Sequence, residues 1–120
     1  DESSLVGADV GIEHTKVDPH KPPKARVLAP TKQLQFALLF KRKPTAGRIE
    51  IEVSNQTGHV DVQWDSLAAI VEDFTTGQFY YGISCNAEES GFEAGSYQAK
   101  VSVGGKSVAL LNWGIGKARP

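Results

Sequence analysis

The sequence predicts an all-β protein, a two-sheet antiparallel sandwich of about seven strands with at most one short helical turn. Three observations predict this fold class. Apolar and polar residues alternate with period two in several runs, most clearly over Arg48–Val53. The strand-like runs Tyr97–Val103 and Lys106–Ile115 are joined by a two-glycine turn, which is typical of a hairpin. Leu67–Phe74 has a helix-like spacing, and no other stretch of the chain does.

The first third of the chain predicts two strands separated by a loop. Leu5–Glu13 alternates, with Val6, Ala8, Val10 and Ile12 on one side, and is the first predicted strand. Asp18–Pro30 contains four prolines, and because proline lacks the donor that a sheet needs, we expect an exposed, extended and mobile loop. Leu34–Phe40 is densely apolar and predicts a central strand buried on both faces.

The middle third predicts a hairpin. Along Arg48–Val53 the apolar residues alternate with Glu50 and Glu52, and in the next run Val60, Val62 and Trp64 alternate with Asp61, Gln63 and Asp65. A four- or five-residue loop around Asn55–Gly58 would join the two runs.

Leu67–Phe74 has two interpretations. It fits a helical stripe with Asp65 or Ser66 as N-cap, or Ile70–Phe74 forms a strand; we favour a helical turn or an irregular crossover. Strands over Gln78–Cys85, Tyr97–Val103 and Lys106–Ile115 complete the set.

Length and composition describe a single globular domain over residues 1–120. Apolar residues make up 40% of the chain and charged residues 22%, with a net charge of −1, so we expect no nucleic-acid partner and no membrane span. The chain has no methionine and no signal-peptide pattern at its start. It is therefore interpreted as a processed mature protein or a piece of a longer one, and an extracellular or periplasmic location is expected.

Charges are distributed in blocks. Residues 16–48 hold nine Lys or Arg and one acid, whereas residues 49–99 hold nine acids and no Lys or Arg. These blocks predict oppositely charged faces that steer a charged partner in a salt-dependent way. The alternative is that basic and acidic strands lie side by side and cancel locally.

Residues that could carry catalysis or bind a metal do not form a recognised set. His14, His20 and His59 lack metal-ligand spacing, and Asp61, Asp65, Glu72 and Asp73 lack the spacing of a calcium loop. Glu50 and Glu52 are interpreted as a solvated strand face, and the lone Cys85 as a small buried apolar residue. We therefore expect no enzyme activity, no metal and no cofactor.

The run Gly91–Gly105 resembles the last hairpin of many immunoglobulin-like or fibronectin-like sandwich domains. The resemblance implies an immunoglobulin-like sandwich in which Tyr97 forms a tyrosine corner, its buried hydroxyl bonded to an upstream backbone group. Ala99 stands where the antibody-type pattern has cysteine. The chain therefore resembles the disulfide-free domains of bacterial envelope and secreted proteins.

The candidate binding residues are aromatic or basic: Trp64, Tyr80, Trp113, Lys41, Arg42 and Lys43. Phe79-Tyr80-Tyr81 must divide between the two faces of a strand, and an exposed Trp or Tyr on a sandwich can anchor a protein or stack on a sugar ring. The basic run Lys41–Lys43 fits an anionic surface, or it only solubilises a strand end. We interpret the chain as a non-enzymatic protein-interaction or structural module of an exported protein, with a carbohydrate-binding module as the alternative.

Overall fold

The computed structural model describes residues 5–12, 17–19, 26–45, 47–87 and 91–117, and it confirms the predicted all-β sandwich. The described elements, in chain order, are β1 (Leu5–Gly11), β2 (Val27–Leu28), β3 (Gln33–Phe40), β4 (Arg48–Asn55), β5 (Gly58–Ser66), the 3-10 turn η2 (Leu67–Ala69), β6 (Val71–Asp73), β7 (Gln78–Asn86), β8 (Gly95–Val103) and β9 (Lys106–Ile115). Two of these strands are very short, since β2 has two residues and β6 has three. The remaining strands are those that the sequence predicts.

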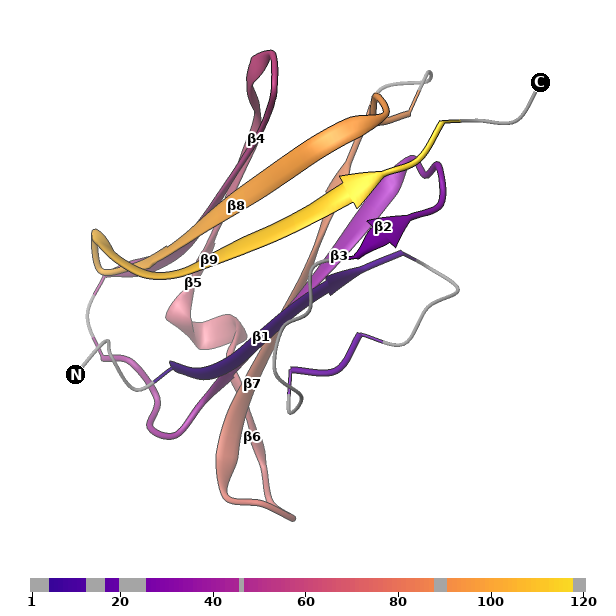
Figure 1. The fold of residues 1–120 in the computed structure, drawn as a ribbon. Coiled ribbons are helices and arrows are strands. Elements are labelled where there is room, and N and C mark those ends of the chain that lie inside the picture. The colour runs from indigo at the N-terminus through magenta and orange to yellow at the C-terminus, as the bar shows by residue number, and fades with distance from the viewer. Residues whose placement is uncertain (1–4, 13–16, 20–25, 46, 88–90, 118–120) are drawn as a thin grey trace.

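The strands form two sheets, with the order β1-β3-β7-β6 in one and β2-β9-β8-β4-β5 in the other. Figure 1 shows the two sheets as separate layers, with the β8–β9 hairpin in one and β1, β3 and β7 in the other. Neighbouring strands are antiparallel except for β2, which pairs with β9 in parallel.

The core consists of the side chains that alternate strands point into the gap between the sheets. Leu34, Phe36, Leu38 and Phe40 of β3 are each at most 2% exposed, and the inward residues of β4 and β8 are buried equally well. Ala37 and Leu39, on the opposite face of β3, are buried too. The prediction of a central strand buried on both faces is therefore confirmed.

Both predicted hairpins are present. Gly104 and Gly105 join β8 to β9 with φ of 60° and 83°, a left-handed conformation that glycine adopts without steric cost. The β4–β5 turn is tighter than predicted, because Asn55 pairs directly with Gly58. The Asn55 side chain stabilises this turn by accepting bonds from the Thr57 backbone N–H at 2.9 Å and from the Thr57 hydroxyl at 2.6 Å.

Two details of the prediction are corrected. The pairing of β1 with β3 shifts register between Leu5 and Gly7, so Val6 is 52% exposed instead of sharing the core face with Ala8 and Val10. Asp18–Pro30 is not all exposed loop, because Val27–Leu28 forms β2 on the edge of β9. The part of that loop at residues 20–25 lies outside the described structure, as do His14 and His20.

Both interpretations of Leu67–Phe74 are partly right. Ser66 caps the turn η2, because its side chain accepts a bond from the Ala68 N–H at 3.1 Å. Ile70 then returns to extended backbone, and Val71–Asp73 pairs with the start of β7.

Candidate binding surface

Trp64 lies on the outer face of the five-stranded sheet. It pairs in register with Glu50, whose side chain points away from the core residues Ile49 and Ile51. Trp64 is 59% exposed and its neighbour Val62 is 39% exposed. Val62 and Trp64 therefore face solvent, which is the reverse of the usual alternation on a half-buried strand, whereas Val60, at the register shift, packs against the core.

The polar residues of β5 face the other sheet. The Tyr81 hydroxyl of β7 donates a hydrogen bond to Oδ2 of Asp65 at 3.0 Å, and the Cys85 thiol donates to Oδ2 of Asp61 at 3.1 Å. Gln63 also donates to Oδ2 of Asp61, at 2.8 Å. Because these bonds fix the inward face of β5, Trp64 is held on the outward face.

These contacts make the Cys85 thiol and the Tyr81 phenol poor acids. Burial, followed by the hydrogen bond and the charge of Asp61, raises the pKa of Cys85 to about 12. Burial and Asp65 raise the pKa of Tyr81 in the same way. Cys85 is fully buried and stays protonated at neutral pH, as expected of a structural cysteine.

Arg48 lies over the Trp64 ring and also contacts Glu50. The guanidinium carbon of Arg48 lies 4.8 Å from the ring centroid, in cation–π range. Nη2 of Arg48 also lies 3.2 Å from Oε2 of Glu50. The three side chains form an ordered group on the outer face, which we call the Trp64 cluster.

Opposite charges alternate next to the Trp64 cluster. Glu52 pairs in register with Lys100 on one side and with Val62 on the other, and Lys100 pairs with Leu110, which is 56% exposed. On this face acidic and basic residues therefore lie beside one another. The Glu52–Lys100 pair is thus a local cancellation of charge between the acidic block and a lysine outside the basic block of residues 16–48.

The other predicted binding residues do not join Trp64. Trp113 is in the core, 4% exposed, where it stacks on Tyr97 at 5.8 Å and meets the edge of Phe36 at 5.8 Å. This position excludes Trp113 from a surface site. Tyr80 is 38% exposed but lies on the outer face of the other sheet, while Tyr81 beside it is buried, so the aromatic run divides as predicted.

The basic run Lys41–Lys43 is exposed in the connection between β3 and β4. Arg48 and Phe74 are among the exposed residues that the sequence did not single out. Arg48 belongs to the Trp64 cluster. The predicted hairpin could have identified it, because Arg48 begins one strand opposite the end of the other. Phe74, 88% exposed in the β6–β7 turn, had no signal in the apolar pattern.

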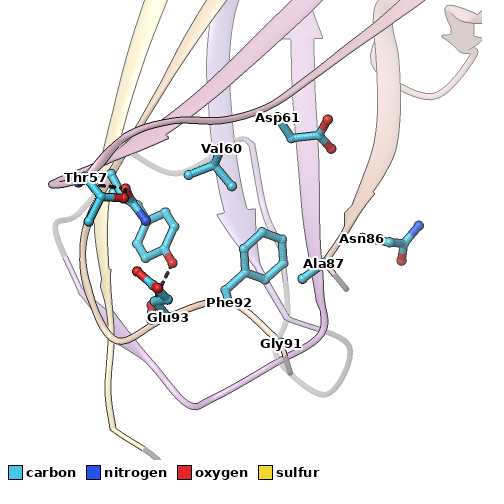
Figure 2. A pocket seen from close by; sticks show the side chains of 10 residues that line it. Thr57, Val60, Asp61, Asn86, Ala87, Gly91, Phe92 and Glu93 are labelled. Atoms are coloured by element: carbon cyan, nitrogen blue, oxygen red, sulfur yellow. Dashed lines mark hydrogen bonds between the residues drawn. The ribbon is translucent and has the colours of Figure 1, made fainter. Parts of the chain in front are cut away.

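A cavity of about 400 Å³ lies at one end of the sandwich, beside the β4–β5 turn and the β7–β8 connection. Figure 2 shows Phe92 and Val60 in the middle of its lining, with Thr57 and Glu93 on one side and Asp61 and Asn86 on the other. Asp61 accepts from Cys85, and Oδ1 of Asn86 accepts from Gln33 at 3.0 Å. The lining is thus occupied with bonds within the fold and does not define a ligand class.

The same end of the molecule contains the predicted tyrosine corner. The Tyr97 hydroxyl donates a 2.6 Å hydrogen bond to the backbone carbonyl of Glu93, drawn as a dashed line in Figure 2. Tyr97 is 3% exposed, which confirms that it is buried and bonded as predicted. Within the described residues, no group of three or more His, Cys, Asp or Glu could hold a metal ion, and no helix is long and apolar enough to span a bilayer.

No family model matches the chain, and no curated protein matches its sequence. Solved structures that match include Pseudomonas fluorescens alkylpurine DNA glycosylase AlkC bound to DNA containing an abasic site analog. Identity is 11% and the TM-score 0.48, and the match covers 93% of this chain but 32% of the AlkC chain.

This match contradicts two expectations from the sequence, that the chain is not an enzyme and that it has no nucleic-acid partner, because the matched protein is an enzyme bound to DNA. Both exclusions are withdrawn. A likeness this distant does not support assigning glycosylase activity or DNA binding to the present chain either.

Proposed function

We propose that the chain is a protein-interaction module that binds a protein partner through the outer face of the five-stranded sheet, with Trp64 as the anchor. The observation that carries the proposal is the Trp64 cluster, an exposed tryptophan whose ring lies under Arg48, which in turn pairs with Glu50. Tryptophan and arginine are the residues most enriched among those that dominate interface energies.

The contact of Arg48 with the Trp64 ring favours binding. A side chain that is already fixed loses less conformational entropy when a partner covers it. Val62 adds exposed apolar area on the same face, and Glu52 and Lys100 lie beyond it as a polar component. An apolar anchor with a mixed polar surround is the usual composition of a protein–protein interface.

We also propose that the sandwich is immunoglobulin-like and belongs to an exported protein, in an extracellular or periplasmic location. The strand order supports the first part: β1-β3-β7-β6 corresponds to the A-B-E-D sheet, and β9-β8-β4 to the G-F-C sheet. The tyrosine corner at Tyr97, near the start of the strand that corresponds to F, supports it further. Fractionation of the native source with an antibody to the chain would test the location.

Carbohydrate binding is the second candidate, and the exposed Trp64 ring is the observation that favours it. Arg48 already lies over that ring, Trp113 is in the core, and Tyr80 is on the other sheet. Because a sugar platform benefits from several aromatic rings on one surface, these positions favour a protein partner.

The test compares three immobilised forms of the chain in a pull-down from the native source. Wild type and the control Phe74→Ala, which removes an exposed aromatic residue from the β6–β7 turn of the other sheet, should retain the same specific protein, and Trp64→Ala should lose it. Loss of a tryptophan anchor costs about 2 kcal/mol or more, roughly 30-fold in Kd. Equal retention by Trp64→Ala would contradict the proposal. Retention on a polysaccharide column that is lost in Trp64→Ala would favour the carbohydrate alternative.

A further inference from the structure

The sandwich has lateral edges whose strands present unpaired backbone groups, and such edges pair with other chains unless the sequence protects them. In the described structure the five-stranded sheet ends at β5 and at β2–β9, and the four-stranded sheet ends at β1 and β6. The four edges differ in protection.

Three edges carry protective features. On β5, Asp61 and Asp65 point inward, and an inward charge on an edge strand opposes the addition of another strand. The β6 edge is three residues long and contains Glu72 and Asp73. The β1 edge has an irregular register beside Val6.

The β9 edge lies within 8 Å of β1 of the opposite sheet at some Cα positions, but it has fewer protective features along its own sequence. β2 pairs with Gly114 and Ile115 of β9 and with no earlier residue among those described. The stretch Ser107–Asn112 contains no charged residue and no proline, and Leu110 within it is 56% exposed. A register shift against β8 leaves Val108 as a bulge at the start of this stretch, and Ala109–Asn112 pairs regularly with β8.

Alternate residues of this stretch point their backbone N–H and C=O groups away from β8. Gly114 and Gly116 donate their N–H groups away from β8, to the carbonyls of Arg26 at 2.8 Å and Leu28 at 2.9 Å. Successive residues of a strand alternate the side to which their N–H and C=O point. Leu110 and Asn112 therefore direct theirs to the same open side as Gly114.

We propose that a second copy of this chain pairs with this edge, β9 against β9 in antiparallel, across a two-fold axis at Leu110. In this register Leu110 lies opposite Leu110 of the second copy, and Val108 lies opposite Asn112. The pairing satisfies the outward main-chain groups and buries two exposed leucine side chains against each other. A second copy fits because a two-fold interface must be self-complementary. An uncharged stretch meets this condition, since it can lie opposite its own copy without repulsion between like charges.

The register also keeps like charges apart. Lys106 falls level with Gly114 of the second copy, where β2 begins, and so does not face Lys106 of that copy. Lys100 lies one strand further in, beside Glu52. The stretch that pairs thus brings neutral residues together.

The pairing goes beyond the proposed function and does not depend on it. β9 and β5 lie toward opposite ends of the strand order β2-β9-β8-β4-β5, so a dimer through β9 leaves both Trp64 clusters uncovered. Two clusters in one particle would bind a multivalent partner with higher avidity than one.

The experiment measures mass against concentration by sedimentation equilibrium for wild type, Leu110→Glu and Leu110→Lys. Wild type should rise from 12.9 kDa toward twice that mass. Each charged variant should associate about tenfold more weakly or worse, because the two-fold axis places like charges opposite each other. An equimolar mixture of the two variants should recover the dimer, because Glu then faces Lys, and recovery also shows that both variants are folded. Val62→Glu, at the protected edge strand, should dimerise as wild type does.

Wild type that stays at 12.9 kDa up to about 1 mM would overturn the proposal. So would a Leu110→Glu chain that dimerises as wild type does, a mixture that recovers nothing, or a Val62→Glu chain that is monomeric.

Discussion

The Tyr81 hydroxyl donates a hydrogen bond to Asp65 across the gap between the two sheets, with 3.0 Å between the oxygens. Together with the bond from Cys85 to Asp61, it fastens the edge strand β5 to β7 of the opposite sheet. β6 is too short to lie beside the whole of β7, since it pairs with Gln78–Tyr80 and with no later residue among those described. These two bonds therefore stabilise the side of the sandwich that β6 leaves uncovered.

Removing one partner of this bond should destabilise the fold. We expect Tyr81→Phe to lower the free energy of unfolding by about 1–3 kcal/mol, because Asp65 then loses a donor in a partly buried site. The measurement is urea unfolding of Tyr81→Phe, Asp65→Ala and the double variant. A coupling energy of about 1 kcal/mol is expected, and additive losses would contradict a direct bond.

Stability should fall at alkaline pH because of Cys85. The pKa of this thiol is raised to about 12 in the folded chain, whereas an unfolded cysteine has a pKa of about 8.5. Between these values the unfolded chain has lost the proton and the folded chain still holds it, so rising pH favours unfolding. The free energy of unfolding should therefore keep its full value below about pH 8.5 and decline above it by up to about 1.4 kcal/mol per pH unit.

The measurement is urea unfolding at intervals from about pH 8 to about pH 10.5, for wild type and Cys85→Ala. The variant lacks the thiol and should show a smaller slope between about pH 8.5 and about pH 10, before the ordinary tyrosine pKa is reached. Identical slopes in the two chains would contradict the assignment to Cys85.

The tyrosine corner gives a separate test of stability. Tyr97→Phe removes the 2.6 Å bond to the carbonyl of Glu93 at a buried site, and we expect a loss of about 1–3 kcal/mol. Tyr80→Phe is the matched control, because Tyr80 lies on the outer face of a sheet and is 38% exposed. Thermal or urea unfolding that leaves Tyr97→Phe as stable as the control would mean that the bond does not contribute.

The strands themselves could be predicted, because the core follows their apolar periodicity. Ile49, Ile51 and Val53 alternate with glutamates and are buried as that pattern implies. The face of β5 could not be predicted in the same way. In β5 the residues Val60, Val62 and Trp64 alternate with Asp61, Gln63 and Asp65. Such a pattern places the apolar residues in the core only where no other contact decides which face of the strand points inward. Here the acids have buried donors, Tyr81 and Cys85, on a strand of the other sheet.

The candidate site could be predicted only in part, because the apolar pattern of a strand does not show which of its faces points to the core. Trp64 and Trp113 both follow a strand pattern, and the sequence does not distinguish an outward tryptophan from an inward one. Trp113 is inward because Tyr97 and Phe36 provide aromatic partners for its ring. The position of Arg48 over Trp64 depends on the register of β4 with β5, which the turn at Asn55–Gly58 sets and which the sequence predicted as a longer loop.

The two tryptophans should differ sharply in fluorescence. Trp64 is 59% exposed and Trp113 is 4% exposed, so acrylamide should quench the first strongly and the second weakly. In Trp113→Phe the remaining emission comes from Trp64 and should be red-shifted and readily quenched. In Trp64→Phe the remaining emission comes from Trp113 and should be blue-shifted and protected.

Each variant serves as the control for the other, because the chain contains two tryptophans. Trp113→Phe also removes an indole N–H that is buried without a hydrogen-bond partner in the described structure, which offsets part of the cost of the lost volume. The variant should therefore fold, and circular dichroism would verify it. Strong quenching in Trp64→Phe, or protection in Trp113→Phe, would mean that β5 presents its other face to solvent and that Trp64 is not available to a partner.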